Sequence, residues 1–173
     1  MGEGTEDKYL DFRRKRFQLQ HRLTGAFGAG VHSAQGSAEQ LRLEVKRSDV
    51  LFTSFQAFRG VMGEELKKRL NIQYEGEEGI DSGGITKEWY LDLSRAFLSA
   101  EHGMFTKTEE GLYVVDARSG RANPSTHIQY FHFFGRLLGK AIRDSTLVDV
   151  PLCPVMYGEN EGKEEQRSVS SLY

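Results

Sequence analysis

The chain has 173 residues, of which 38% are apolar and 28% are charged, and this composition excludes an intrinsically disordered protein. Its length suits one domain with a hydrophobic core better than two. The net charge of −2 excludes a general attraction to nucleic acid or anionic lipid, and no apolar run approaches the roughly 20 residues of a membrane helix. The single cysteine, Cys153, excludes an internal disulfide and indicates a reducing compartment. We therefore predict a cytoplasmic domain without nucleic-acid or membrane partners.

Residues 1–40 are predicted to hold a basic helix and a glycine-rich connector. Residues 7–23 show helical spacing of apolar side chains and include a basic cluster at residues 13–16. Such a cluster is most often a solvated helix face, although a nuclear address or a phosphate-binding stripe has the same composition. A nuclear location therefore stays open beside the cytoplasmic one. Residues 24–37 alternate glycines with small residues, which is typical of a flexible connector.

A strand, a helix and a second extended segment are predicted next. Residues 41–45 alternate apolar and polar side chains, as a half-buried strand does. Ser48 and Asp49 then offer an N-cap to an apolar helix that ends at the glycines of residues 60–63. Residues 64–70 suggest one or two further helical turns, and residues 71–74 look extended. The pattern indicates an α+β domain.

The stretch from residue 75 to residue 89 alternates glycines and acids between the extended segment and the next helix, residues 85–98. Gly83 and Gly84 could cradle a phosphate at that helix N-terminus. Acids crowd the same loop, however, and Lys87 is the nearby cation in the sequence, so the charges disfavour an anion. We favour a structural seam, in which Asp81 or Ser82 caps the helix.

The helix after this stretch carries an apolar side chain at every fourth position. Those residues are Ile85, Trp89, Leu93 and Phe97. Trp89 lies within the stripe, so we predict a core anchor rather than a stacking platform. Residues 104–106 and 112–115 are predicted to form a hairpin, and residues 119–124 a loop with Gly120, Asn123 and Pro124 as breakers.

A last long helix is predicted at residues 125–144. Its expected core stripe consists of Ile128, Phe131, Phe134, Leu138 and Ile142. Gly135 and Gly139 stand one turn apart, and each costs about 1 kcal/mol relative to alanine, so we expect another backbone to press against them. Residues 147–151 look extended. Residues 158–173 are polar and without periodicity, which predicts a disordered tail.

The sequence offers no catalytic, cofactor-binding or metal-binding set. The acids do not follow the order of an EF-hand, and His21, His32, His102, His127 and His132 lack zinc-site spacing. Cys153 lies in an apolar run without a neighbouring Lys, Arg or His, which favours a buried structural thiol over a nucleophile.

Several motifs, in order, resemble the HECT ubiquitin-ligase domain, within the N-terminal part of its N-lobe. The signature is residues 75–89, EGEEGIDSGGITKEW. The supporting segments are LRLEVKR at 41–47, VL at 50–51, MF at 104–105, SG at 119–120, HIQYF at 127–131 and FGRLLGKAI at 134–142. The resemblance covers residues 41–157 and implies a partial, mainly helical HECT N-lobe with short strands and a hairpin, followed by a tail, residues 158–173, outside the family.

The resemblance implies a route for ubiquitin. It passes from a ubiquitin-conjugating enzyme to a cysteine in the C-lobe, and then to a lysine of a substrate protein that the sequence does not identify. We expect this chain to lack the docking subdomain and the C-lobe, and Cys153 does not stand at the family's catalytic position. We therefore expect it to be inactive alone, as a fragment of a ligase. Some relatives also bind ubiquitin noncovalently on this lobe with help from an aromatic residue, and this chain departs from that pattern with Ser82 at the corresponding position, which leaves this ubiquitin contact open. The alternative is a non-enzymatic module that binds ubiquitin or another partner.

Overall fold

The computed structural model describes residues 14, 15, 17–19, 21, 22, 39–78, 83–122 and 124–157. The described positions before residue 39 are helical and exposed, in agreement with the helix predicted at residues 7–23. The predicted connector at residues 24–37 and the predicted tail at residues 158–173 lie outside the described residues. Within the described residues, no helix has the length and apolarity needed to cross a membrane.

A β-α-β unit opens the domain. Strand β1 (Gln40–Val45) pairs in parallel with β2 (Arg69–Tyr74), from Gln40 opposite Arg69 to Val45 opposite Tyr74. Parallel strands need a crossover, and here it includes the short 3-10 helix η1 (Arg47–Asp49) and helix α2 (Val50–Arg59). Leu41, Leu43 and Val45 alternate with exposed residues, which confirms the predicted half-buried strand.

Helix α2 begins where the sequence predicted. The Asp49 carboxylate accepts a hydrogen bond from the backbone N–H of Phe52 at 3.4 Å, and Gly60 forms the C-cap. The helical turns predicted at residues 64–70 are instead a 3-10 helix, η2 (Gly63–Lys67), and β2 already begins at Arg69. The pairing of Leu70 with Leu41, both buried, explains why the strand starts earlier than predicted.

Helix α3 (Gly84–Leu98) carries the predicted stripe into the core. Trp89, Leu93 and Phe97 are completely buried, and Ile85 packs at the edge. The indole N–H of Trp89 donates to the Ser54 hydroxyl on α2 at 2.8 Å, which satisfies its one polar group. The prediction that Trp89 is a core anchor is confirmed.

The predicted hairpin is present, and the predicted loop after it is partly helical. Strands β3 (Phe105–Lys107) and β4 (Tyr113–Val115) pair antiparallel, with Gly111 in the left-handed region at φ 86° in the connecting turn. The 3-10 helix η3 (Ala100–His102) precedes β3. The loop expected at residues 119–124 contains a four-residue helix, α4 (Ser119–Ala122). Asp116 favours this turn, because its carboxylate accepts from the backbone N–H of Arg118 at 2.7 Å.

Helix α5 (His127–Arg143) buries a different face from the predicted one. Its core residues are Phe133, Phe134, Leu137 and Ala141. Ile128 is 67% exposed and Ile142 is 47% exposed, so the stripe expected through Ile128 and Ile142 is wrong. At about 100° per residue the buried face lies roughly a third of a turn from the expected one.

Two glycines mark the exposed face of α5. A Cβ atom built on Gly135 or Gly139 would meet no heavy atom within 4 Å. The expectation that another backbone presses against them is therefore not met within the part of the chain that the structure describes.

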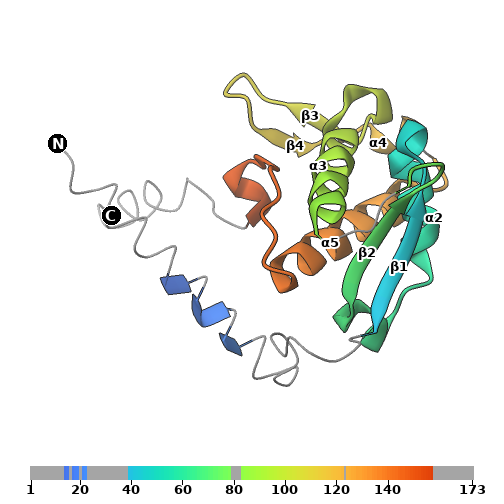
Figure 1. Ribbon diagram of the computed structural model, residues 1–173. Coiled ribbons are helices and arrows are strands. Elements are labelled where there is room, and N and C mark those ends of the chain that lie inside the picture. Colours follow the sequence, from blue (N-terminus) through green and yellow to red (C-terminus); the bar gives the residue numbers. More distant parts are fainter. Residues whose placement is uncertain are drawn as a thin grey trace, which may run out of the picture.

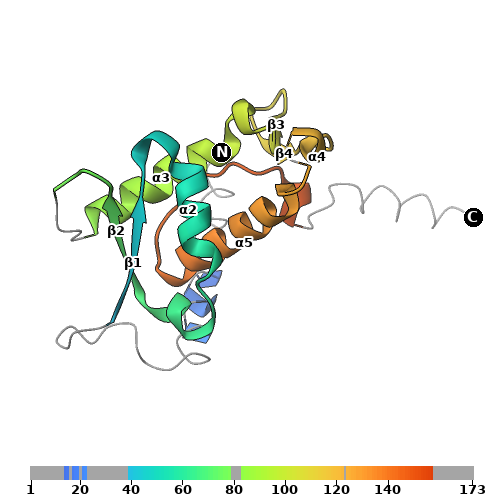
Figure 2. The same ribbon diagram turned by 90° about the vertical axis from the view of Figure 1, so that its right-hand side faces the viewer.

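One core joins these elements into an α+β fold that is mainly helical, as predicted. Helix α3 runs between the parallel pair and the hairpin, and α2 stands between β1 and α5 (Figures 1 and 2). Phe133 lies at the centre of the helical layer, with its ring centroid 5.8 Å from that of Phe55 and 5.5 Å from those of Phe58 and Phe97. The chain after α5 returns to the hairpin and ends its described part in a 3-10 helix, η4 (Pro154–Tyr157).

Candidate functional site

The acidic, glycine-rich stretch lies where the two parallel strands end and α3 begins. Residues 75–78 follow β2 directly, and the N-cap of α3 is Gly83, in the left-handed region at φ 107°. A side chain at this position would be strained, so glycine suits it. Asp81 and Ser82 lie outside the described residues. The N-cap residue of α3 is thus Gly83 and not Asp81 or Ser82, while the hydrogen bonds predicted from Asp81 or Ser82 to the start of this helix stay predictions.

Arg47, the first residue of η1 and two residues beyond the end of β1, is the centre of this site. Its Nε and one terminal nitrogen contact the two carboxylate oxygens of Glu77, at 2.7 and 3.0 Å. Its terminal nitrogens also reach Glu88, at 3.0 and 3.4 Å, and Asp92, at 3.2 Å, both on α3. The guanidinium group has five N–H donors, and these contacts occupy them all. Arg47 thereby joins β1, the loop after β2, and α3.

Tyr74 completes the arrangement beneath the arginine. The guanidinium carbon of Arg47 lies 3.8 Å from the centre of the Tyr74 ring, a cation–π contact. The Tyr74 hydroxyl donates to Asp92 at 3.2 Å. Burial, and then the negative charge of Asp92, raise the pKa of Tyr74, so the phenol stays protonated. The hydrogen bonds from Arg47 lower the pKa of Glu77, so that carboxylate stays charged.

The acids of this stretch are paired with basic residues that the sequence analysis did not place there. Lys46 forms an ion pair with Glu75 at 3.1 Å, and an Arg69 nitrogen lies 3.3 Å from where a Cβ on Gly83 would stand. The inference that Lys87 is the nearby cation is therefore wrong, because the parallel pairing of β1 with β2 brings Lys46 and Arg47 next to these acids. A phosphate cradle is still disfavoured, but for a different reason: the donors of Arg47 are already used.

Chemically, this site holds backbone segments together. Its charged groups are bound to one another, and it presents no nucleophile next to a base among the described residues. Arg47 is the residue that sequence reasoning missed. The signal was available, because a basic pair directly after a strand faces an acidic run directly after its parallel neighbour.

Cys153 is half-buried and free, beside the hairpin. Its backbone N–H donates to the Tyr113 carbonyl at 2.9 Å, next to a parallel bridge between Tyr113 and Leu152. Within the described residues its thiol has no hydrogen bond to a base. This setting agrees with a structural role, although the side chain is less buried than predicted.

The histidines do not assemble into a metal centre in the described part of the chain, where no group of three or more His, Cys, Asp or Glu side chains is placed to hold an ion. His102 lies in η3, His127 lies against Gly120, and His132 is exposed on α5. His32 lies outside the described residues.

A buried ion pair sits on the inner face of α5. The Lys140 ammonium group contacts the Asp144 carboxylate, to which the Tyr90 hydroxyl also donates at 3.5 Å. Burial lowers the pKa of Lys140 and raises the pKa of Asp144. Breaking such a pair by removing one partner is costly, so we assign it to the helix packing rather than to chemistry.

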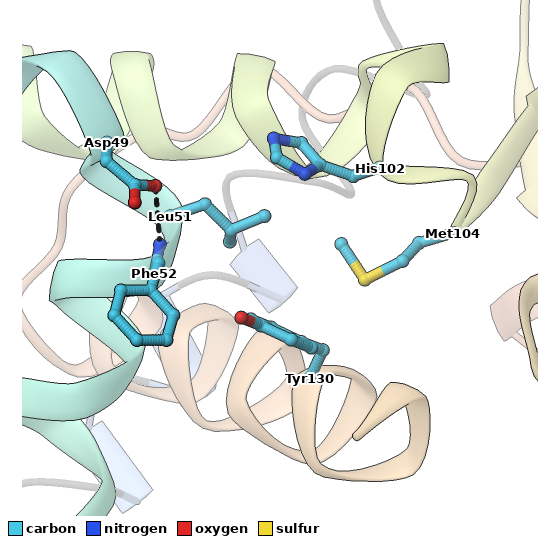
Figure 3. Close-up of a pocket in the computed structure, with 6 residues that line it drawn as sticks. All are labelled: Asp49, Leu51, Phe52, His102, Met104 and Tyr130. Atoms are coloured by element: carbon cyan, nitrogen blue, oxygen red, sulfur yellow. Dashed lines mark hydrogen bonds between the residues drawn. The ribbon is translucent and has the colours of Figure 1, made fainter. Parts of the chain in front are cut away.

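A small cavity opens between the start of α2, η3 with the residue that precedes β3, and α5 (Figure 3). Its volume is about 40 Å³, and the share of one water molecule in the liquid is about 30 Å³. His102, Met104 and Tyr130 line it together with residues 49, 51 and 52. It is too small for a substrate.

Comparison with known proteins shows similarity to one protein family. Residues 91–164 match the HECT-domain (ubiquitin-transferase) family, from within α3 to beyond η4. The chain is 40% identical over 148 residues to E3 ubiquitin-protein ligase UPL2 of Arabidopsis thaliana. This alignment covers 83% of this chain and 4% of that protein. It is 33% identical over 145 residues to E3 ubiquitin-protein ligase TOM1 of Saccharomyces cerevisiae, which covers 82% of this chain and 4% of that protein.

A shorter relative gives the same result. The chain is 32% identical over 112 residues to E3 ubiquitin-protein ligase Smurf1 of Drosophila melanogaster, which covers 65% of this chain and 11% of that protein. The chain thus spans a small part of the curated relatives that it matches. With the matched segment and these relatives together, the chain belongs to the HECT family of ubiquitin-ligase domains.

Proposed function

We propose that residues 41–157 form part of the N-lobe of a HECT ubiquitin ligase and act as its scaffold. The observation that carries this proposal is the match of residues 91–164 to the HECT family. In this role the chain takes part in passing ubiquitin from a conjugating enzyme to a substrate protein. The Arg47 site supports the scaffold assignment, because its acids and bases are bound to one another.

The acceptor cysteine of the transfer is, in this proposal, not Cys153. Thioester exchange requires a thiolate to attack the thioester carbon between ubiquitin and the conjugating enzyme, which then leaves as a thiolate. Cys153 sits beside the Tyr113–Leu152 bridge, and its thiol has no basic partner within the described residues. The chain alone is therefore inactive in transfer, and a catalytic cysteine comes from other sequence.

A thioester assay tests this directly. The chain is mixed with conjugating enzyme charged with ubiquitin, and the products are separated with and without reducing agent. We expect no ubiquitin adduct that reducing agent removes. An adduct that forms on the natural chain and disappears in Cys153→Ser would show that Cys153 is the acceptor and would overturn the proposal.

A second candidate function is noncovalent binding of ubiquitin by the exposed face of α5. The observation that favours it is the apolar character of this face, where Ile128 and Ile142 are exposed and Phe131 and Leu138 are half-buried. Titration of isotope-labelled ubiquitin with the chain, followed by NMR, tests it. Shifts that Ile142→Ser abolishes and Met62→Ser (also an exposed apolar residue, between α2 and η2) preserves would support it. Unchanged ubiquitin spectra at millimolar chain would exclude it.

A further inference from the structure

A second, larger cleft lies between α2 and α5, and the scaffold function proposed above does not use it; it shares only Ile128 with the exposed apolar face of α5. Its volume is about 280 Å³. We call it the α2–α5 cleft and define it by six of its lining residues. These are Phe55 and Arg59 from α2 and Ile128, His132, Phe133 and Arg136 from α5.

The cleft has an apolar floor and an apolar wall. Phe55 and Phe133 are buried, and their ring centroids are 5.8 Å apart, so the floor is fixed by core packing. Ile128 is 67% exposed on the first turn of α5. An apolar side chain that entered the cleft would therefore find aromatic surface below it and an aliphatic side chain beside it.

The rim is basic, and within the described residues no carboxylate lines it. Arg136 is held in place, because it donates to the Phe58 carbonyl at 3.3 Å and to the Val61 carbonyl, and its guanidinium lies over the Phe58 ring. Arg59 is exposed and has no hydrogen bond or ion pair within the described residues. His132 also lines the cleft, and its imidazole ring can donate a hydrogen bond. This is the opposite of Arg47, whose donors are all occupied by acids of the same chain.

Size and charge together define what fits. Sites for small-molecule ligands occupy roughly 300–1,000 Å³, so this cleft is at the lower limit and suits one or two side chains. Nucleic acid carries a charge about every 1.7 Å and needs a longer basic stripe than two arginines provide. A second copy docked face to face would bring equal positive rims together. We propose that the α2–α5 cleft binds an acidic peptide segment of a partner protein, with one apolar side chain inserted between flanking carboxylates.

Fluorescence anisotropy with a labelled peptide tests the proposal. The probe is Glu-Glu-Leu-Glu-Glu, and the comparison peptides are Gln-Gln-Leu-Gln-Gln and Glu-Glu-Ser-Glu-Glu. We expect saturable binding of the probe to the full chain and weaker binding of both comparison peptides. Arg59→Gln should weaken probe binding by about 1.5- to 5-fold, the range for one exposed ion pair, and Arg59→Glu by more. Ile128→Ser should weaken binding of the probe and leave binding of Glu-Glu-Ser-Glu-Glu nearly unchanged.

Matched variants control for loss of charge or apolar surface elsewhere. Arg95→Gln removes an exposed arginine from α3, and Leu147→Ser removes a side chain that is 79% exposed, and neither should affect binding. All four substituted side chains are exposed, so the variants should fold normally. The proposal is wrong if the probe does not bind at millimolar protein, or if Arg59→Gln and Arg95→Gln have equal effects. It is equally wrong if a single-stranded oligonucleotide binds as tightly and with the same dependence on Arg59.

Discussion

Arg47 connects three segments that are remote in the sequence, and it does so through contacts of one side chain. Its five N–H donors reach Glu77, Glu88 and Asp92, and its flat face covers Tyr74. Lysine would keep the charge but could not reproduce the fork, since an ammonium group is a point charge with three donors. The site therefore depends on the shape of the arginine as well as its charge.

We predict that Arg47→Gln raises the pKa of Glu77 and weakens the pH dependence of stability. The folded-state pKa of Glu77 is lowered from 4.5, so its contribution is present above that value and is lost as the pH falls through the folded-state pKa. NMR titration of the carboxyl carbons gives the pKa, and urea unfolding at neutral and acidic pH gives the stability. Glu78→Gln removes an exposed acid that forms no ion pair within the described residues, so this matched control should leave the pKa of Glu77 in place. An unchanged pKa in Arg47→Gln would contradict the assignment.

Sequence reasoning identified the importance of the 75–89 stretch but not its partner. Counted along the sequence alone, Lys87 is the cation near the acids of this stretch. The parallel register places Val45 opposite Tyr74, so the residues after each strand meet at one edge. Register and strand direction are set by the crossover and the core, and a local pattern of charge does not contain them.

At the scale of elements, helix α5 shows that the buried face of a strongly apolar helix is difficult to predict from its sequence. Its sequence has apolar side chains on more than one face, so two stripes compete. The one that is buried carries Phe133 and Phe134, whose rings pack against Phe97. The helix and its bounds were predictable from spacing and breakers, whereas the choice of face depends on which aromatic rings the neighbouring helices present. Helix α3 has a single stripe, and there the prediction was confirmed.

We predict that Gly135→Ala and Gly139→Ala each stabilise the chain by about 0.5–1 kcal/mol. Both glycines lie inside a helix, and a Cβ on either would meet nothing within 4 Å. Thermal or urea unfolding measures the change. Gly83→Ala, at φ 107°, is the contrasting variant and should destabilise. Destabilisation by the α5 substitutions would show that another segment packs closely on this face.

At the scale of the whole molecule, the aromatic rings unite the helical layer. Phe133 touches rings from α2 and α3, and Trp89 links α3 to α2 through Ser54. A core of this kind has no internal boundary at which one part could separate from the rest. Unfolding of residues 39–157 should therefore be cooperative.

We predict that Phe133→Ala destabilises the chain by about 3–5 kcal/mol, as expected for loss of a buried aromatic side chain. Fluorescence of Trp89, the single tryptophan, reports the packing of α3, and far-ultraviolet circular dichroism reports all the helices. The unfolding transitions that these two signals report should shift together to lower stability. Phe52→Ala, at a side chain that is 48% exposed, should cost much less. Two separated transitions would indicate that the layers unfold independently.

The parallel pair has a consequence for backbone protection. Within the described residues β1 and β2 pair only with each other, so each has one edge without a strand neighbour. Along a parallel strand, successive amides point alternately towards the partner and away from it. Amide hydrogen exchange should therefore alternate between slow and fast from residue to residue along both strands, while the amides around Leu93 and Leu137 exchange slowly throughout. The outward amides are also the groups that an added strand from another protein would engage.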